Sequence, residues 1–246
     1  MYGAYLVTGA SKGIGRSIAL SIAESGYPVI ALARNSEELR QIESELQSIS
    51  NESISIACDL AVASDISSAA DQILSKFQHL SGIIHNAGII HPIANMLNAQ
   101  RTDWERTIQV NLVGVQDLTR SLVSILGGEN HTRITTISSG AAQRSLHGWS
   151  AYCVSKAGLD MWAQCMAVEG VHENISALAI APGIVDTGMQ EDIRGADETS
   201  FPLLANFIEY HRNGDLTNPV DVAKKLLPYC LGKSGINGDR LDIRNL

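Results

Sequence analysis

Short apolar runs alternate with longer amphipathic stretches along the whole chain, and this alternation restricts the fold more than any other feature. The apolar runs have the length of buried strands, and they are Ala4–Thr8, Val29–Ala33, Ile54–Ala57, Gly82–His85, Arg133–Ser138, Ser176–Ala179 and Arg240–Ile243. The amphipathic stretches have the length of helices, and they lie near 14–26, 36–49, 65–79, 102–126, 151–171 and 220–231. Because a strand that rejoins its sheet in parallel needs a crossover, the pattern predicts an α/β fold. We expect a doubly wound, seven-stranded parallel sheet flanked by helices.

We expect residues 1–246 to form a single domain, because the chain has no internal repeat and no linker rich in Pro or Gly. One segment breaks the alternation. Between Pro182 and Pro219, glycines and prolines separate short amphipathic pieces such as Leu203–His211. An insertion of this length after a late strand predicts a substrate loop or lid over residues 188–218, at the carboxyl end of the sheet.

The composition argues against large charged partners. Charged residues make up 18% of the chain, the net charge is −8, and no block of Lys and Arg is present. We therefore expect no nucleic-acid or membrane partner, and no apolar run is long enough to span a bilayer. The four cysteines are far apart and no histidine stands at metal-ligand spacing. These features predict free thiols, no metal site and a cytoplasmic location.

A glycine-rich turn follows the first predicted strand and opens the first predicted helix. Its sequence is Thr8-Gly9-Ala10-Ser11-Lys12-Gly13-Ile14-Gly15. Glycines in this arrangement allow a tight turn and a close approach of phosphate to the backbone, and the helix N-terminus favours an anion. The strand, turn and helix together predict a Rossmann-type dinucleotide site.

The residues after the second predicted strand indicate which dinucleotide binds. Arg34 and Asn35 stand where a carboxylate would accept hydrogen bonds from an unphosphorylated ribose, and Lys12 lies in the glycine turn. Two cations can neutralise a 2′-phosphate, whereas a carboxylate would repel it. The sequence therefore favours NADP(H).

A tyrosine and a lysine stand four residues apart in the helical stretch 151–171. Tyr152 and Lys156 therefore share one helix face, and a nearby ammonium lowers the pKa of a phenol towards a useful general acid or base. Ser139 follows the fifth predicted strand, at the sheet edge where catalytic groups collect. Asn111 interrupts an otherwise helical stretch, which indicates a hydrogen-bonding role.

These motifs together resemble the classical short-chain dehydrogenase/reductase family over nearly the whole chain. The matching positions are Thr8–Gly15, Asp59-Leu60, Asn86-Ala87-Gly88, Asn111, Ser139, Tyr152-x-x-x-Lys156 and Pro182-Gly183-Ile184-Val185-Asp186-Thr187. Ser139 is favoured over Ser138 because it stands thirteen residues before Tyr152, the usual interval in the family.

The resemblance implies a role for each matching residue. Ser139 would orient a substrate carbonyl, Tyr152 would donate the proton, and Lys156 would lower the pKa of Tyr152 while binding the nicotinamide ribose. Asn111 would hold a water in a proton relay. The remaining matches would bind the cofactor, and they are Asp59, Leu60, Asn86, Ala87, Gly88, Val110, Pro182, Gly183, Ile184, Val185 and Thr187.

Within the family, the chain is similar to the branch of sepiapterin reductases and benzil reductases. In sepiapterin reductases a late Asp anchors the pterin, and Asp242 stands at the matching position, although a strand-end cap would look the same in sequence. Trp149 and Met189 are expected to line an apolar substrate pocket. His85 departs from the family, which commonly has Asn there, and a structural role at the strand end is favoured.

These observations predict an NADPH-dependent reductase of a bulky ketone or vicinal dicarbonyl. An alternative within the family is a 3-oxoacyl-[acyl-carrier-protein] reductase, and an alternative of another class is a non-catalytic NADP(H)-binding sensor or scaffold. By resemblance, the stretches 102–126 and 151–171 would pair two chains in a homodimer, with a tetramer as the larger option. The apolar residues that suggest this pairing are Leu118, Leu122, Met161, Trp162 and Met166.

Overall fold

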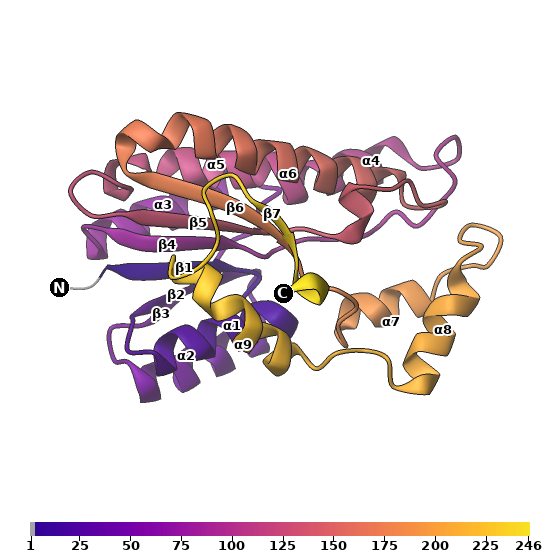
Figure 1. Ribbon diagram of the computed structural model, residues 1–246, viewed down its shortest axis with the longest axis horizontal. Helices are drawn as coiled ribbons and strands as arrows, with labels where there is room; N and C mark the ends of the chain where they lie inside the picture. Colours follow the sequence, from indigo (N-terminus) through magenta and orange to yellow (C-terminus); the bar gives the residue numbers. More distant parts are fainter. Residues whose placement is uncertain (1–2) are drawn as a thin grey trace.

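The computed structural model describes residues 3–246, and in it seven parallel strands form one sheet (Figure 1). The strands are β1 (Ala4–Thr8), β2 (Val29–Ala33), β3 (Ile54–Ala57), β4 (Leu80–His85), β5 (Thr132–Ile137), β6 (Ile175–Ala181) and β7 (Arg240–Asp242). Their order is β3-β2-β1-β4-β5-β6-β7, so the winding of the chain reverses between β1 and β4. Such a reversal opens a crevice at the carboxyl ends of the strands. The predicted fold class is confirmed.

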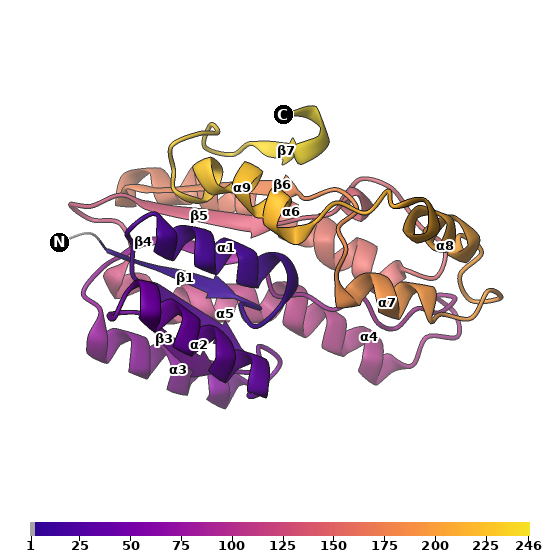
Figure 2. The same ribbon diagram turned by 90° about the horizontal axis from the view of Figure 1, so that it is seen from below.

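Helices cover both faces of the sheet (Figures 1 and 2). On one face lie α1 (Gly13–Glu24), α2 (Glu37–Ile49) and α9 (Pro219–Cys230). On the other lie α3 (Ala63–Lys76), α4 (Arg101–Ile108), α5 (Gly114–Ser121) and α6 (Ser150–Glu169). Short helical turns complete the chain, and they are η2 (Val123–Ile125), η3 (Gly140–Ala142), η4 (Gly170–Glu173) and η5 (Ile243–Asn245). No helix within residues 3–246 has the length and apolar character needed to cross a membrane.

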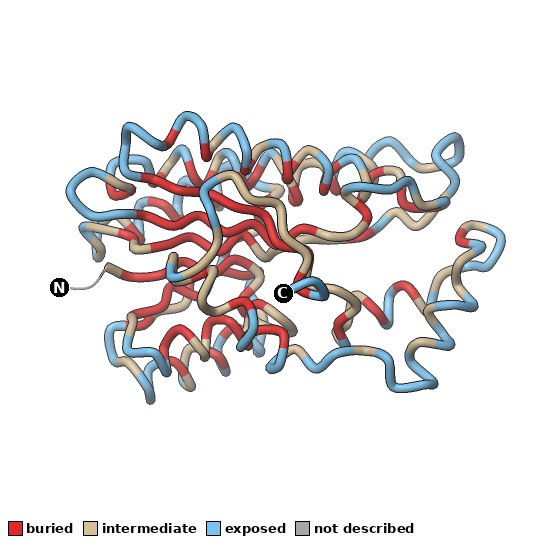
Figure 3. The backbone as a smooth tube through the Cα atoms, in the orientation of Figure 1, coloured by how far each residue is buried: buried red, intermediate tan, exposed pale blue. Residues whose placement is uncertain are grey.

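The five inner strands, β1, β2, β4, β5 and β6, are buried on both faces, whereas the edge strands β3 and β7 are partly exposed (Figure 3). Successive side chains of a strand point to opposite faces, so Tyr5 and Val7 join the core beneath α1 and α9. Leu6 joins the second core, which packs against α3 and α5. The sheet therefore holds two apolar layers together and fixes the edge at which its carboxyl ends meet.

The stretch predicted as one helix over 102–126 contains a break. A π-helical turn, η1 (Gln109–Val113), separates α4 from α5, and Asn111 lies in it. Gly114 follows the turn where the backbone comes close to the segment after β3, since a Cβ atom there would lie 2.3 Å from the carbonyl oxygen of Leu60. Turns of this kind often occur at functional sites.

The segment predicted as a lid contains two helices, α7 (Gly188–Arg194) and α8 (Leu204–Asn213), which lie beyond the carboxyl ends of the strands (Figure 1). The segment leaves and rejoins the domain at one place, because Val185 pairs with Thr217 in a parallel bridge. Phe201 and Ile193 of this segment form a third apolar cluster with Trp149 and Tyr152. The segment thus packs on residues that border the crevice.

Candidate active site

A cavity of about 710 Å³ occupies the crevice at the carboxyl ends of the strands. Its walls come from the residues that follow β1 to β6 and from α6, α7 and α8. It brings together most of the residues predicted to bind a dinucleotide, namely Gly9, Ser11, Lys12, Gly13, Ile14, Arg34, Asn35, Asp59, Leu60, Asn86, Ala87, Gly88, Val110, Tyr152, Lys156, Pro182, Gly183, Ile184, Val185 and Thr187. A single elongated site therefore joins segments from most of the chain.

Two residues of the glycine turn, Thr8 and Gly15, support the cavity without lining it. The Thr8 hydroxyl accepts hydrogen bonds from the main-chain N–H groups of Asn86 and Ala87, each at 3.0 Å. The Asn86 amide donates back to the Thr8 carbonyl at 2.9 Å. A Cβ atom on Gly15 would lie 2.3 Å from both the Asn86 amide nitrogen and the Gly9 carbonyl oxygen. Neither Thr8 nor Gly15 lines the cavity, so they act by tying the turn to the end of β4.

The remaining residues of the turn suit an anion. Gly9 and Gly13 have φ values of 65° and 58°, which residues with a side chain rarely adopt. Ser11, Gly13 and Ile14 line the cavity where α1 begins. The first N–H groups of a helix have no partner within it, and the helix dipole adds positive potential there. This end of the cavity can therefore hold a pyrophosphate.

Two cations line the cavity from different segments: Arg34 follows β2, and Lys12 precedes α1, with its ammonium 3.8 Å from where a Cβ atom on Gly188 would lie. Lys12 and Arg34 both line the cavity. In the part of the chain that the structure describes, neither side chain forms a hydrogen bond or an ion pair. Arg106, which sequence reasoning missed, also lines this end and donates to the Asp59 carboxylate at 2.8 Å. Burial opposes ionisation of Asp59, but the Ala61 N–H and Arg106 outweigh it and hold the pKa of this carboxyl below its usual value.

The predicted catalytic residues meet farther along the cavity. Tyr152 and Lys156 lie one turn apart on α6, and the Lys156 ammonium is 5.9 Å from the centre of the Tyr152 ring. Lys156 also donates to the main-chain oxygen of Ile137 at 2.8 Å. Ser139 lies beyond the end of β5, and its hydroxyl can donate to the Tyr152 oxygen. The phenol, the ammonium and the alcohol therefore share one wall.

Burial controls the protonation of these groups. Tyr152 and Lys156 are only 6% and 3% exposed, although both line the cavity. Burial raises the pKa of Tyr152 to about 12, partly opposed by Ser139. Burial lowers the pKa of Lys156 to about 8, partly opposed by Asp160. Desolvation thus outweighs the lowering of the Tyr152 pKa that the sequence led us to expect from Lys156, because it disfavours both charged forms.

Asn111 is fully buried and does not line the cavity. Its side-chain oxygen accepts from the Ile89 N–H at 2.8 Å, and its amide donates to the Ile89 carbonyl and to the Ser155 hydroxyl, both at 2.9 Å. A Cβ atom on Gly88 would lie 3.4 Å from both Asn111 and the Lys156 ammonium. The side chain fixes the segment after β4 beside Lys156, and its role in a water relay stays a prediction.

The far end of the cavity is aromatic. Trp149 stacks on Phe201 with ring centres 5.0 Å apart and an interplanar angle of 6°, and it also contacts Phe207 and the edge of Tyr152. The predicted residue Met189 lines this end too. Sequence reasoning missed other lining residues, namely Ile90, Arg144, Leu146, Ile193, Leu203, Asn206, Phe207 and Tyr210. The amphipathic pattern of Leu203–His211 was the one signal that could have indicated some of them.

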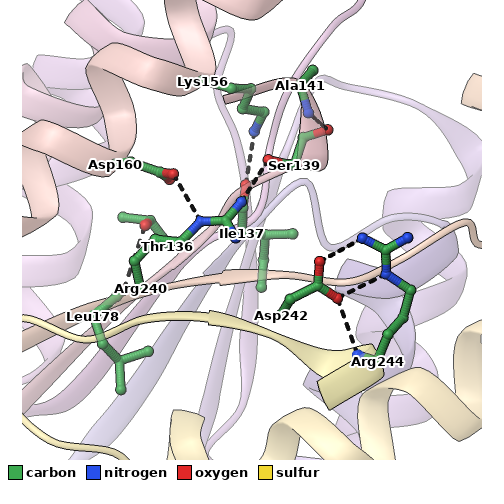
Figure 4. Close-up of polar contacts among 10 residues, drawn as sticks. All are labelled: Thr136, Ile137, Ser139, Ala141, Lys156, Asp160, Leu178, Arg240, Asp242 and Arg244. Atoms are coloured by element: carbon green, nitrogen blue, oxygen red, sulfur yellow. Dashed lines mark hydrogen bonds and ion pairs between the residues drawn. The ribbon is translucent and has the colours of Figure 1, made fainter. Parts of the chain in front are cut away.

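Asp242 does not line the cavity, so its predicted contact with substrate is not met. Its carboxylate accepts from the Arg244 guanidinium at 2.9 and 2.6 Å and from the Arg244 N–H at 3.0 Å (Figure 4). These short bonds turn the side chain towards the turn that follows β7. The structure thus matches the alternative interpretation of a strand-end cap.

His85 also lies outside the cavity lining. It is buried at the end of β4, where its Nε2 atom lies 2.9 Å from the Thr119 hydroxyl and its ring packs edge-on against Trp162. Burial lowers the pKa of this imidazole to about 3, so it remains neutral. The structural interpretation of His85 agrees with this arrangement.

The sheet order, the glycine turn and the Ser-Tyr-Lys wall define a dinucleotide-binding oxidoreductase. Residues 4–198 match the family model described as short chain dehydrogenase, and the chain belongs to this family. It is therefore an enzyme that acts on carbonyl or alcohol groups with a nicotinamide cofactor.

Three similar proteins indicate to which branch of the family the chain belongs. The chain is 33% identical over 246 residues to a benzil reductase ((S)-benzoin forming) of Bacillus subtilis, with 98% of each chain covered. It is 30% identical over 182 residues to an NADPH-dependent pterin aldehyde reductase of Arabidopsis thaliana, with 74% of each covered. A putative short chain dehydrogenase from Escherichia coli, solved with NADPH, superposes with a TM-score of 0.83 at 26% identity, covering 98% of this chain and 96% of that one. The chain lies in the benzil reductase and sepiapterin reductase branch, as predicted.

Proposed function

We propose that this protein is an NADPH-dependent carbonyl reductase that reduces a ketone or vicinal dicarbonyl, with Tyr152 as the general acid. The observation that carries the proposal is one continuous cavity with two chemically different ends. Ser139, Tyr152 and Lys156 lie towards one end, beside the aromatic residues, and Arg34 lies towards the other, beyond β2.

The cavity residues fit the dinucleotide. A Cβ atom on Gly13 would lie 3.1 Å from the Thr187 methyl, so a glycine there allows the turn to approach Thr187 closely. Thr187, with Ile184 and Val185, would hold the carboxamide, and Asp59 and Leu60 would flank the adenine. When bound, the reduced nicotinamide supplies the hydride that the carbonyl carbon accepts.

The protein's own residues would supply binding and the proton. The Ser139 hydroxyl would donate a hydrogen bond to the substrate oxygen, and the Tyr152 phenol would transfer its proton to that oxygen as negative charge develops there. Lys156 would stabilise the resulting phenolate, since its pKa of about 8 leaves it mostly charged at neutral pH. Because burial raises the pKa of Tyr152 to about 12, the phenol carries the proton that reduction requires at neutral pH.

The aromatic end supports a bulky aromatic substrate. Trp149 and Phe207 line this end and offer flat apolar surface to an aryl group, while the fully buried Phe201 supports the Trp149 ring from the other side. The benzil reductase of B. subtilis acts, by its name, on such a diketone. A pterin is the weaker candidate, because Asp242 is bound to Arg244 outside the cavity.

The test of this proposal is NADPH oxidation followed with a panel of benzil, sepiapterin and a 3-oxoacyl thioester. We expect turnover of benzil with the highest kcat/KM of the three. Turnover of the thioester alone would replace the proposal with the 3-oxoacyl-[acyl-carrier-protein] reductase alternative. Binding of NADPH without turnover of any carbonyl would favour the sensor.

Arg34→Asp is expected to weaken NADPH binding relative to NADH by about 10- to 100-fold, because a charge-assisted phosphate contact is lost and a repulsive charge is introduced. Fluorescence titration with each cofactor measures the ratio of the Kd values for NADPH and NADH. Arg40→Asp is the matched control, since Arg40 is exposed on α2 and does not line the cavity. An unchanged NADPH preference in Arg34→Asp would show that Arg34 does not contact the phosphate.

A homodimer through α5 and α6 belongs to the same proposal. Leu118 and Leu122 are buried in the core of the subunit, so they cannot contribute to pairing as predicted. Met161 is 58% exposed, and with Val154 and Val168 it leaves apolar surface on α6. The cytoplasm is the proposed location, because all four cysteines are free thiols.

A further inference from the structure

An ion pair lies behind the catalytic wall. Arg240, the first residue of β7, donates from Nε to the Asp160 carboxylate of α6 at 3.2 Å, and the two side chains are only 14% and 10% exposed (Figure 4). The Nη2 atom of Arg240 donates to the main-chain oxygen of Ser139 at 3.0 Å. One guanidinium therefore connects the catalytic helix with the segment that carries the catalytic serine.

Asp160 also stands one helical turn beyond Lys156 on the same face of α6. Its Oδ1 atom is buried and has no hydrogen-bond partner among residues 3–246. Its negative charge raises the pKa of Lys156 against the dominant effect of burial. An unpartnered carboxylate oxygen in this place can act on Lys156 without a direct bond.

We propose that the Asp160–Arg240 pair is a positioning unit of the active site, in which Asp160 holds Lys156 in its ammonium form and Arg240 fixes the backbone of Ser139. This inference rests on the proposed roles of Tyr152, Lys156 and Ser139. It also gives β7 a function, because its pairing with β6, which sets Ala179 opposite Arg240, brings the guanidinium to the site.

The Asp160–Arg240 pair contributes charge close to Lys156, whereas the other side chains that face Lys156 are neutral. Tyr152 on α6 and Ser139 beyond β5 are neutral at neutral pH, and so is Asn111 in η1. Asp160 and Arg240 form the ion pair on the other side of this wall. Removal of one or the other should therefore move the protonation of Lys156 in opposite directions.

The experiment compares the pH dependence of kcat/KM for benzil reduction in Asp160→Asn, Arg240→Gln and Arg240→Lys. In the wild type, kcat/KM should fall above the pH at which Lys156 loses its proton, and we call this pH the alkaline break. The break should move to lower pH in Asp160→Asn and to higher pH in Arg240→Gln. In Arg240→Lys the charge remains, so the break should stay in place. The kcat of this variant should fall several-fold, because Lys cannot bond both Asp160 and Ser139 as the planar guanidinium does.

A second readout does not depend on turnover. The loss of urea resistance caused by Asp160→Asn should be larger at neutral pH, where Lys156 is charged, than at about pH 9.5, where it is largely neutral. In a Lys156→Met background the effect of Asp160→Asn should no longer depend on pH. A merely structural ion pair would give the same loss at both pH values and in both backgrounds.

The outcomes separate this inference from the proposed function. Full activity in Tyr152→Phe would remove the proposed function itself. An inactive Tyr152→Phe together with unmoved pH breaks in Asp160→Asn and Arg240→Gln would overturn the positioning role alone. If Asp160→Asn fails to fold, as judged by circular dichroism, the two Arg240 variants decide. Values of kcat and alkaline breaks equal to those of the wild type in both variants would overturn the positioning role.

Discussion

Tyr152→Phe is expected to lower kcat for ketone reduction by about 10³-fold, within the range that a lost general acid produces. The change removes one oxygen atom and leaves the ring in place, so the edge contact with Trp149 and the apolar cluster around it persist. Without the phenol, negative charge on the substrate oxygen has only the Ser139 hydroxyl to stabilise it. NADPH affinity should change little, because the phosphate-binding end of the cavity is formed by other residues.

Stopped-flow absorbance of NADPH measures the chemical step, and fluorescence titration measures cofactor affinity. Tyr210→Phe is the matched control, because Tyr210 lines the same cavity but lies on α8. It should retain most of the activity. Undiminished turnover in Tyr152→Phe would show that another group supplies the proton.

Lys156→Met is expected to lower kcat/KM by about 10²-fold or more, because the phenolate formed in the reaction loses its nearby cation. The alkaline break near pH 8, which we assign to Lys156, should disappear. The lysine and methionine side chains have similar lengths, so the packing around Tyr152 should be retained. A pH profile that retains the break would assign it to another group.

The same variant should be as stable as the wild type or more stable at neutral pH. The pKa of Lys156 is lowered from its ordinary 10.5 to about 8 by burial. Below about pH 8 the lysine is charged in both the folded and the unfolded state, so the whole desolvation cost opposes folding. Between about pH 8 and 10.5 the unfolded chain binds more protons, so this cost is relieved as the pH rises.

A pKa difference of this size corresponds to on the order of 3 kcal/mol, which the loss of the bond to Ile137 offsets in part. Urea unfolding at neutral pH measures the change in free energy. Lys224→Met on the exposed side of α9 is the control and should change neither stability nor activity. Marked destabilisation of Lys156→Met would contradict the assignment of Lys156 as a buried, strained cation.

Local patterns were sufficient for most of the fold and for the glycine turn to which we assign the cofactor. The glycine turn could be placed because its glycines fix the backbone within a few residues, as the positive φ values of Gly9 and Gly13 show. Tyr152 and Lys156 could be paired because a helix repeats its faces at fixed spacing. The predicted strand β4 began two residues late, since a strand boundary also depends on its neighbours.

Predictions failed where the outcome depended on contacts between distant segments. Asp242 is the exception, because Arg244, which occupies its carboxylate, stands only two residues away and the contact is local. Leu118 and Leu122 have the character of interface residues, yet they face the core because of the way α5 packs on α3. The aromatic end of the cavity arose from the folding of residues 188–218 back over Trp149.

The amino-acid sequence by itself determined the alternation of strands and helices, the glycine-rich turn and the spacing of Tyr152 and Lys156, because each is set within one or two helical turns or one strand. Only the tertiary structure decided the electrostatics. Asp160 and Arg240 stand 80 positions apart, and the register of β7 on β6 brings them together. Burial, which sets the pKa values of Tyr152 and Lys156, likewise depends on every segment that surrounds them.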